Sequence, residues 1–145
     1  MRWCWRLGVV AALALASFVP ALSRFSAAAA KSCAQRVHAD TSYAVQWDQP
    51  PRTDVSSYRL HITRTGGQAV TGAHVCINSY MLGMSAMAVT DTGREVAPGT
   101  YEMRLTFEMG SKWAGQVIVT VPGKDPVAIP LSLDVTDAWG MSPAS

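Results

Sequence analysis

Residues 101–109 read YEMRLTFEM, and their alternation decides the fold class. Every second residue of this stretch is apolar: Tyr101, Met103, Leu105, Phe107 and Met109. The residues between them are polar or charged. Successive side chains of a β-strand point to opposite faces, so the pattern predicts a half-buried strand over Tyr101–Met109. Met103 and Met109 are therefore expected in the core.

The same period of two recurs along the chain and predicts about seven short strands. The other six are expected at Ser42–Trp47, Ser57–Arg64, Ala73–Ser79, Ala86–Thr90, Trp113–Val121 and Val127–Val135. Turn-forming residues separate them, among them Asp91-Thr92-Gly93. Pro130 favours an edge position for the last strand, because proline cannot donate to a sheet ladder. This spacing is typical of an all-β, immunoglobulin-like antiparallel β-sandwich.

The N-terminal region has the features of an export signal. Arg2 and Arg6 precede an almost wholly apolar stretch, Leu7–Leu22, and small residues follow as far as Ala30. A charged start, an apolar run and small-residue sites are typical of a secretory signal. Two cleavage sites fit, Ala21-Leu22-Ser23 and the run that ends at Ala30, and cleavage after Ala30 is preferred. The alternative is an uncleaved membrane anchor, although the apolar run is shorter than a spanning helix needs. Lipidation at Cys33 is disfavoured, because Lys31, two residues before the cysteine, does not suit the cleavage motif of lipoproteins.

These features divide the chain into four parts and set its expected location. We expect a signal or anchor over 1–30, a flexible arm over 31–41, a β-sandwich domain over 42–136 and a tail over 137–145. The protein is expected to be periplasmic or secreted, and membrane-anchored if the first segment stays attached. Residues 31–145 keep nine of the twelve basic side chains against ten acidic ones. With no basic cluster left, nucleic-acid binding is not predicted.

Two cysteines remain after the expected loss of Cys4 with the signal. Cys33 and Cys76 form an even number of cysteines in a chain expected in an oxidising compartment, so a disulfide between them is favoured. The alternative makes Cys76 a small buried apolar residue and Cys33 a free thiol in the arm. A metal–thiolate site is disfavoured, because the two cysteines have no CxxC spacing.

Three methionines recur at every third position in the stretch Met81–Met87. Thioether sulfur is a soft, neutral ligand suited to Cu(I), so Met81, Met84 and Met87 are candidate copper ligands on a loop or strand end. His74 is a candidate helper, and His61 is considered with it. The alternative is that the methionines fill gaps in the core. Ligand sulfurs would converge at an accessible rim, and packing sulfurs would not.

Catalytic motifs are missing from the sequence. It contains no Gly-x-Ser-x-Gly elbow, no His-Glu-x-x-His and no glycine-rich phosphate loop. We therefore expect no enzymatic activity, no catalytic residues and no small-molecule substrate.

Gly66–Met87 (GGQAVTGAHVCINSYMLGMSAM) resembles the YtkA-like and FixH-like family in its glycine-rich approach to a strand and the methionine-rich stretch after it. Pro98-Gly99-Thr100-Tyr101, and later Phe107-Glu108-Met109-Gly110 with Trp113, are similar to that family's pairing of its last strands. The resemblance covers roughly residues 55–121. It implies an immunoglobulin-like domain outside the cytoplasm, near copper-handling or respiratory-oxidase assembly systems. The family's methionines fall on Met81, Met84, Met87 and Met109.

Two functions follow as expectations. The first is a non-enzymatic periplasmic protein that binds or delivers copper through Met81, Met84 and Met87, with His74 as a helper. The second is a metal-independent interaction module that docks on a membrane or envelope protein complex, with Met81–Met87 as an adaptable apolar contact.

Overall fold

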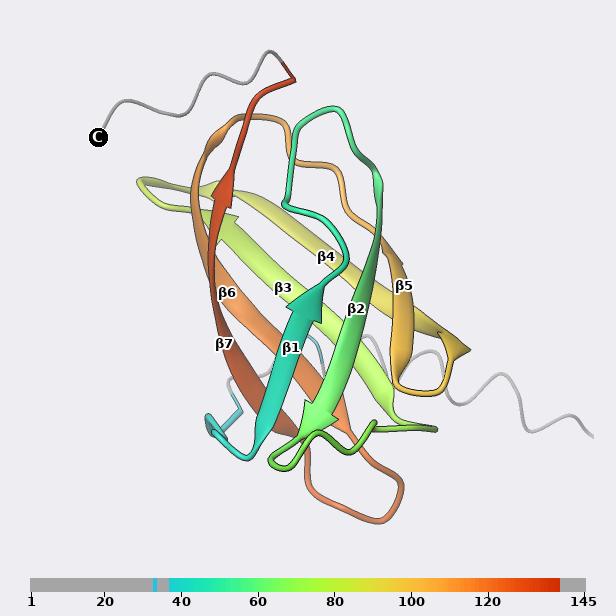
Figure 1. Cartoon of the computed structure of the whole chain (residues 1–145). Coiled ribbons are helices and arrows are strands. Elements are labelled where there is room, and N and C mark those ends of the chain that lie inside the picture. Colours follow the sequence, from blue (N-terminus) through green and yellow to red (C-terminus); the bar gives the residue numbers. More distant parts are fainter. Residues whose placement is uncertain (1–32, 34–36, 139–145) are drawn as a thin grey trace, which may run out of the picture.

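The computed structural model describes Cys33 and residues 37–138 (Figure 1). The expected signal or anchor over 1–30 and most of the expected tail lie outside the described residues. Within the described part of the chain, no helix has the length and apolar character needed to cross a membrane.

Seven antiparallel strands build the domain, as the alternation predicts. They are β1 (Tyr43–Trp47), β2 (Ser57–Arg64), β3 (His74–Met81), β4 (Met84–Ala97), β5 (Thr100–Arg104), β6 (Ser111–Thr120) and β7 (Val127–Val135). Hydrogen-bonded neighbours follow the order β1-β2-β5-β4-β3-β6-β7. The all-β fold class is therefore confirmed.

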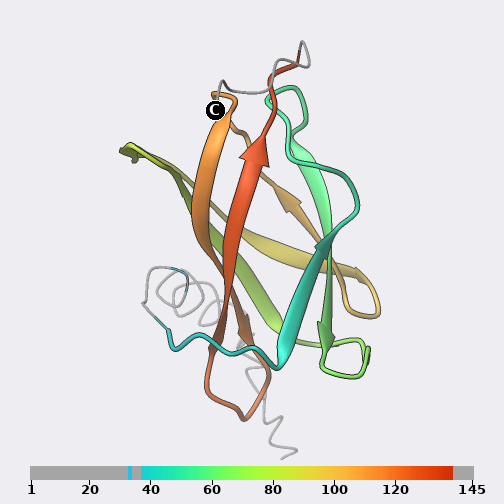
Figure 2. The ribbon, with the colours of Figure 1, turned by 60° about the vertical axis from the view of Figure 1, so that its left-hand side comes forward.

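Strand β4 belongs to both layers of the sandwich (Figures 1 and 2). Its first part, as far as Gly93, pairs with β3, whereas Arg94–Ala97 pairs with β5. One layer is thus β1-β2-β5 with the end of β4, and the other is the start of β4 with β3-β6-β7. In the lettering of immunoglobulin domains these are the ABED sheet and a CFG sheet extended by a C′ strand.

Gly93 marks the point where β4 crosses from one layer to the other. A Cβ at this position would lie 2.8 Å from Met103 Cε and 3.0 Å from Tyr101 Cβ. Glycine lets β4 pass this close to β5 without displacing the Met103 methyl group or the Tyr101 side chain. The predicted turn at Asp91-Thr92-Gly93 is therefore wrong, because the strand that was expected to end at Thr90 continues to Ala97.

The core lies between the two layers and takes the inward residue of each alternating pair. Tyr58, Trp113 and Phe107 lie in it, and Phe107 contacts both of the others edge to face, with ring centroids 6.0 Å and 5.1 Å apart. Such aromatic pairs contribute about 0.5–1.5 kcal/mol beyond their buried area. The alternation thus determines which side chains face the core, and the pairing of the strands determines which of them meet.

The stretch 101–109 forms a shorter strand than predicted. Met103 and Phe107 are buried, as expected, but β5 ends at Arg104. Met109 is 47% exposed, so its predicted place in the core is wrong. The chain turns at this point: the Trp113 indole N–H donates to the Met109 carbonyl, and the Gly110 N–H donates to Asp137. Those two bonds hold the backbone so that the Met109 side chain faces outward.

Strand β7 is an edge strand, as Pro130 predicts, and its outer edge is covered at both ends. Near its start, Ala128 exchanges backbone hydrogen bonds with His38 and Asp40 of the arm. Near its end, Thr136 does the same with the segment Pro51–Thr53. Proline in the middle and bonded segments at the ends protect this edge from further pairing.

The predicted disulfide is confirmed: Cys33 bonds to Cys76, with their Cα atoms 5.8 Å apart. Val75 and Ile77 face the core, so Cys76 between them points to the outer face of its layer. There it forms a small second cluster with Cys33, Ile118 and Val37. The disulfide therefore fastens the arm to the outside of the sandwich and leaves the core independent of it.

Candidate functional site

The methionine-rich stretch forms the hairpin that joins β3 to β4. β3 ends at Met81, β4 begins at Met84, and Leu82-Gly83 makes the turn, with Gly83 at φ 84°. Glycine adopts this left-handed conformation without the steric cost that a side chain would bring. The Leu82 N–H donates to the Lys112 carbonyl at the start of β6. The hairpin projects from the body of the sandwich at the left of Figures 1 and 2.

A bulge follows the turn on the β4 side. Tyr80 pairs with Ala88, but the next β3 residue, Met81, pairs with Met84. Residues 85–87 therefore have no pairing partner in β3, where Tyr80 and Met81 are adjacent. Bulges redirect side chains and bend a strand, and this one includes Met87.

The three methionines take different environments. Met81 is 6% exposed and belongs to the main core cluster, whereas Met84 is 50% exposed at the hairpin tip. Met87 is half-buried and packs against the core. The structure thus places all three on one hairpin but divides them between core, boundary and surface. They do not form one accessible rim of sulfur atoms.

The histidines considered with the methionines lie elsewhere. His74 begins β3 and Met81 ends it, so they are seven positions apart, roughly 23 Å at the usual strand rise. His61 lies on β2, in the other layer, where its Nδ1 is 3.0 Å from Thr100 Oγ1. The fold does not bring either imidazole to the methionine hairpin.

His74 has an unusual environment of its own. Its Nε2 is buried and has no hydrogen-bond partner among the described residues, and the same is true of Oγ1 of Thr120, its cross-strand partner. Burial lowers the pKa of His74 below its ordinary value of 6.5, because the charged form loses hydration. The neutral imidazole is therefore favoured.

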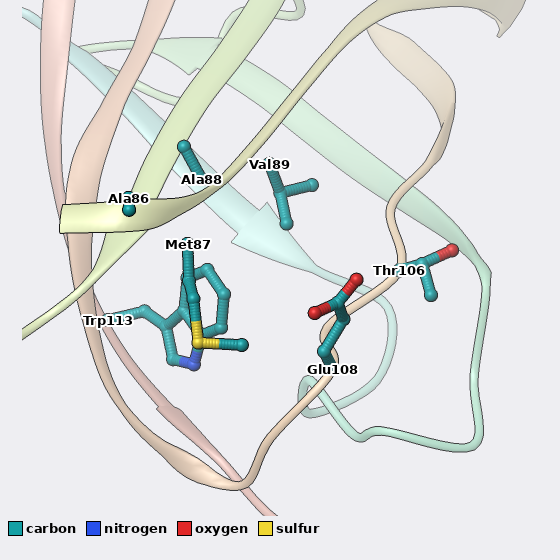
Figure 3. A pocket seen from close by; sticks show the side chains of 7 residues that line it. All are labelled: Ala86, Met87, Ala88, Val89, Thr106, Glu108 and Trp113. Carbon is teal, nitrogen blue, oxygen red and sulfur yellow. The ribbon is translucent and has the colours of Figure 1, made fainter. Parts of the chain in front are cut away.

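A cavity of about 150 Å³ opens beside the bulge (Figure 3). Met87 and Trp113 lie on one side of it, and Thr106 and Glu108 from the segment after β5 lie across from them. Ala86, Ala88 and Val89 complete the lining. The cavity thus combines an apolar wall with one hydroxyl and one carboxylate.

Sequence reasoning missed Thr106 and Glu108 as lining residues. Both fall on the polar face of the Tyr101–Met109 alternation, which favours a solvated surface. No local signal in the sequence distinguishes them from solvated surface residues, because their place beside Met87 depends on β5 ending at Arg104.

The family model for YtkA-like proteins matches residues 37–118. The chain belongs to the YtkA-like family. The match includes the whole β3–β4 hairpin and the cavity residues, and it confirms the resemblance at the family level; the FixH-like part of the resemblance stays a prediction. No curated protein and no solved structure matches the chain.

The hairpin of this YtkA-like domain carries a cluster of exposed apolar side chains. Tyr80, Leu82 and Met84 are 42%, 48% and 50% exposed. The stretch from Asn78 to Thr90 contains no charged residue. Exposed apolar side chains gathered on one element are typical of interaction sites. We call these three residues the hairpin tip.

Proposed function

We propose that this YtkA-like protein is an exported, non-enzymatic interaction module that docks on a protein of a membrane or envelope complex through its hairpin tip. The observation that carries the proposal is the exposure of Tyr80, Leu82 and Met84 on one projecting, uncharged hairpin. Aromatic residues and methionine are enriched in protein interfaces, and charged residues are depleted from interface cores. The tip has this composition.

The proposed location outside the cytoplasm, periplasmic or secreted, rests on two further features. The Cys33–Cys76 disulfide suits an oxidising compartment. The segment ahead of it has the charge and apolar pattern of a secretory signal. If that segment stays attached as an anchor, the domain works at the membrane surface.

Site-specific photo-crosslinking in cells tests the docking proposal. A photoreactive residue replaces Leu82 in one variant and Lys124, an exposed residue of the β6–β7 connection, in the matched control. We expect a discrete crosslinked protein from position 82 only. It should disappear when Met84→Asp is added, because the carboxylate would lose its hydration in the contact. Equal products from both positions, or none from position 82, would overturn the proposal.

Copper binding is the second candidate, and the placement of three thioethers on one hairpin favours it. Met81 and Met84 are cross-strand partners, and the bulge puts Met87 beside an open cavity. Thioethers suit Cu(I), but Met81 would have to leave its core position to join the other two. His74 is too far along β3 to assist within this fold.

A competition titration tests the copper candidate. The purified domain competes for Cu(I) with a chelator of known affinity, first as wild type and then as Met84→Leu with Met87→Leu. Met103→Leu is the control, because Met103 is buried in the core away from the hairpin. Loss of binding in the double variant alone would support the candidate. Binding that none of the changes alters, or no binding at all, contradicts it.

A further inference from the structure

We infer that the free edge of β4 takes up an extended peptide strand of the docking partner, and that a lysine or arginine of this strand enters the cavity beside Glu108. The inference rests on the proposed function and names the partner's binding mode. Four observations carry it: the unpaired edge, its contrast with the edge of β7, the adjacent cavity and the charge of Glu108.

The first observation is the unpaired edge itself. On one side, β4 pairs with β3 residue by residue over Ala88–Thr92, and its Met84 pairs with Met81 beyond the bulge over residues 85–87. Its pairing with β5 on the other side begins only at Arg94. Across Cys33 and residues 37–138, no strand pairs with the other side of Met84–Thr92. An edge of this kind presents unpaired N–H and C=O groups, which is the template that strand addition uses.

The second observation is the contrast with the edge of β7. That edge has Pro130 and is covered by backbone bonds from the arm and from Pro51–Thr53. The β4 stretch contains no proline and no basic residue. Its one charge is Asp91, whose carboxylate accepts a hydrogen bond from the Arg104 N–H at 2.6 Å. Proteins usually blunt exposed edges. The β4 edge has the bulge over residues 85–87 but no covering segment from the described part of the chain, whereas the β7 edge is covered at both ends. The contrast leaves Ala88–Thr92 available to a partner strand.

The third observation is the cavity beside this edge. Ala86 to Val89 of β4 form one wall, and the opposite wall comes from Thr106 and Glu108 (Figure 3). A strand added to β4 would project every second side chain toward the interior of the sandwich, as β4 does with Met87 and Val89. One such side chain would therefore enter the cavity. Its volume of about 150 Å³ accommodates a long side chain.

The fourth observation is the chemistry of the lining. Met87 and Trp113 offer apolar contact for a methylene stem, and Glu108 offers a carboxylate for a cationic head group. Glu108 forms no salt bridge with any described residue. Lysine and arginine bury their stems along apolar surface and keep their charge at a polar rim. This charge complementarity favours a basic peptide over a second copy of the chain, because the β4 stretch has no cation to offer.

A defined peptide tests the inference by nuclear magnetic resonance. The probe is acetyl-TVTKTVT-amide, N-methylated at every threonine so that only one edge can pair and the peptide cannot stack on itself. With the full domain we expect shifts of the amide signals of Met84–Thr92 and of the Trp113 indole, with a Kd of roughly 1 mM or tighter. A peptide methylated at every amide is the matched control and should not bind.

The role of Glu108 is tested by exchanging both partners of the proposed pair. Replacing the lysine of the probe by norleucine should weaken binding to the wild type about two- to fivefold, as for an exposed ion pair. In the Glu108→Gln variant, the lysine and norleucine peptides should bind with equal affinity. Asp125→Asn, which removes an exposed acid of the β6–β7 connection, should behave as wild type.

Several results would overturn the inference. These are absent shifts, shifts that the fully methylated peptide also causes, or a lysine effect that Glu108→Gln does not remove. Slow hydrogen exchange of the outward β4 amides in the free protein would show that the edge is already paired. Protection of the same amides in a dimer that forms as the protein concentration rises would show that a second copy of the chain occupies the edge. Crosslinking from position 82 is independent of the probe. Its persistence would leave the docking proposal standing after the peptide inference fails.

Discussion

Strand β3 joins two regions that differ in pairing far more than in composition. From His74 to Met81 it pairs residue by residue with β6, and this β3–β6 seam buries Val75 and Ile77 completely. At the end of β3 and just past it, the hairpin tip exposes Tyr80, Leu82 and Met84. The buried apolar residues of the seam are explained by the fold, whereas the exposed ones of the tip are not. The difference separates the residues that stabilise this domain from those that are free to serve a partner.

Removing Trp113 from the seam should have the largest effect on stability. Trp113 is buried, pairs with Met81 at the end of β3 and packs edge to face on Phe107. Trp113→Ala should lower the free energy of unfolding by about 3–5 kcal/mol, through lost burial and the cavity left behind. Urea denaturation measures this. Trp113→Phe should lower the free energy of unfolding by less, because it keeps an aromatic ring in the core, although it loses the hydrogen bond to Met109. A loss below about 1 kcal/mol for Trp113→Ala would mean that the seam does not hold the fold.

Breaking the disulfide should have the next largest effect on stability, without changing the structure of the core. Cys33 and Cys76 are 43 positions apart, which on the chain-entropy model corresponds to about 4 kcal/mol. We expect thermal unfolding at a lower temperature in Cys33→Ser with Cys76→Ser, and in reduced wild type. Amide signals of the hairpin tip should stay in place, since the disulfide cluster lies outside the core. Unchanged unfolding under reducing conditions would contradict this.

Period-two alternation predicted the strands because it records which face of a strand is buried. It does not record register or neighbours across the sandwich. Gly93 was expected in a turn, because glycine marks turns and close approaches alike, and nothing local reveals Met103 beneath it. Met109 kept the alternation after the strand had ended, so its side chain was placed in the core, although the bonds of its neighbours turn it outward.

The candidate site was predictable only in its location. The spacing of Met81, Met84 and Met87 indicated one hairpin or loop, and the structure places all three there. Their separation into core, tip and boundary depends on the bulge over residues 85–87, which is a matter of pairing with β3. Likewise, the cavity depends on β4 parting from β5, which no local pattern encodes.

Met81 and Met84 allow the comparison to be made within one pair of cross-strand partners. Met81→Ala should lower the free energy of unfolding by about 2 kcal/mol or more, because Met81 belongs to the core. Met84→Ala should change it by less than about 0.5 kcal/mol, as is usual for exposed residues. Denaturant midpoints of the two variants measure the difference. Equal losses would mean that the tip is part of the core, and the docking proposal would lose its basis.

The smallest effect concerns pH and the opposite end of β3. Burial lowers the pKa of His74, so between that lowered value and 6.5 the unfolded chain binds more protons than the folded one. The stability that the neutral imidazole contributes is therefore present above pH 6.5 and is lost as the pH falls toward the lowered pKa. His74→Gln should flatten this part of the stability profile, measured by urea denaturation between pH 7.5 and pH 5. The hairpin tip contains no histidine, aspartate or glutamate, so its hydrogen-exchange free energies should follow the global profile only where the tip opens with the whole domain. A profile that His74→Gln leaves unchanged would show that the imidazole at the start of the seam stays hydrated when charged, and that the seam is less tightly closed there than at Trp113.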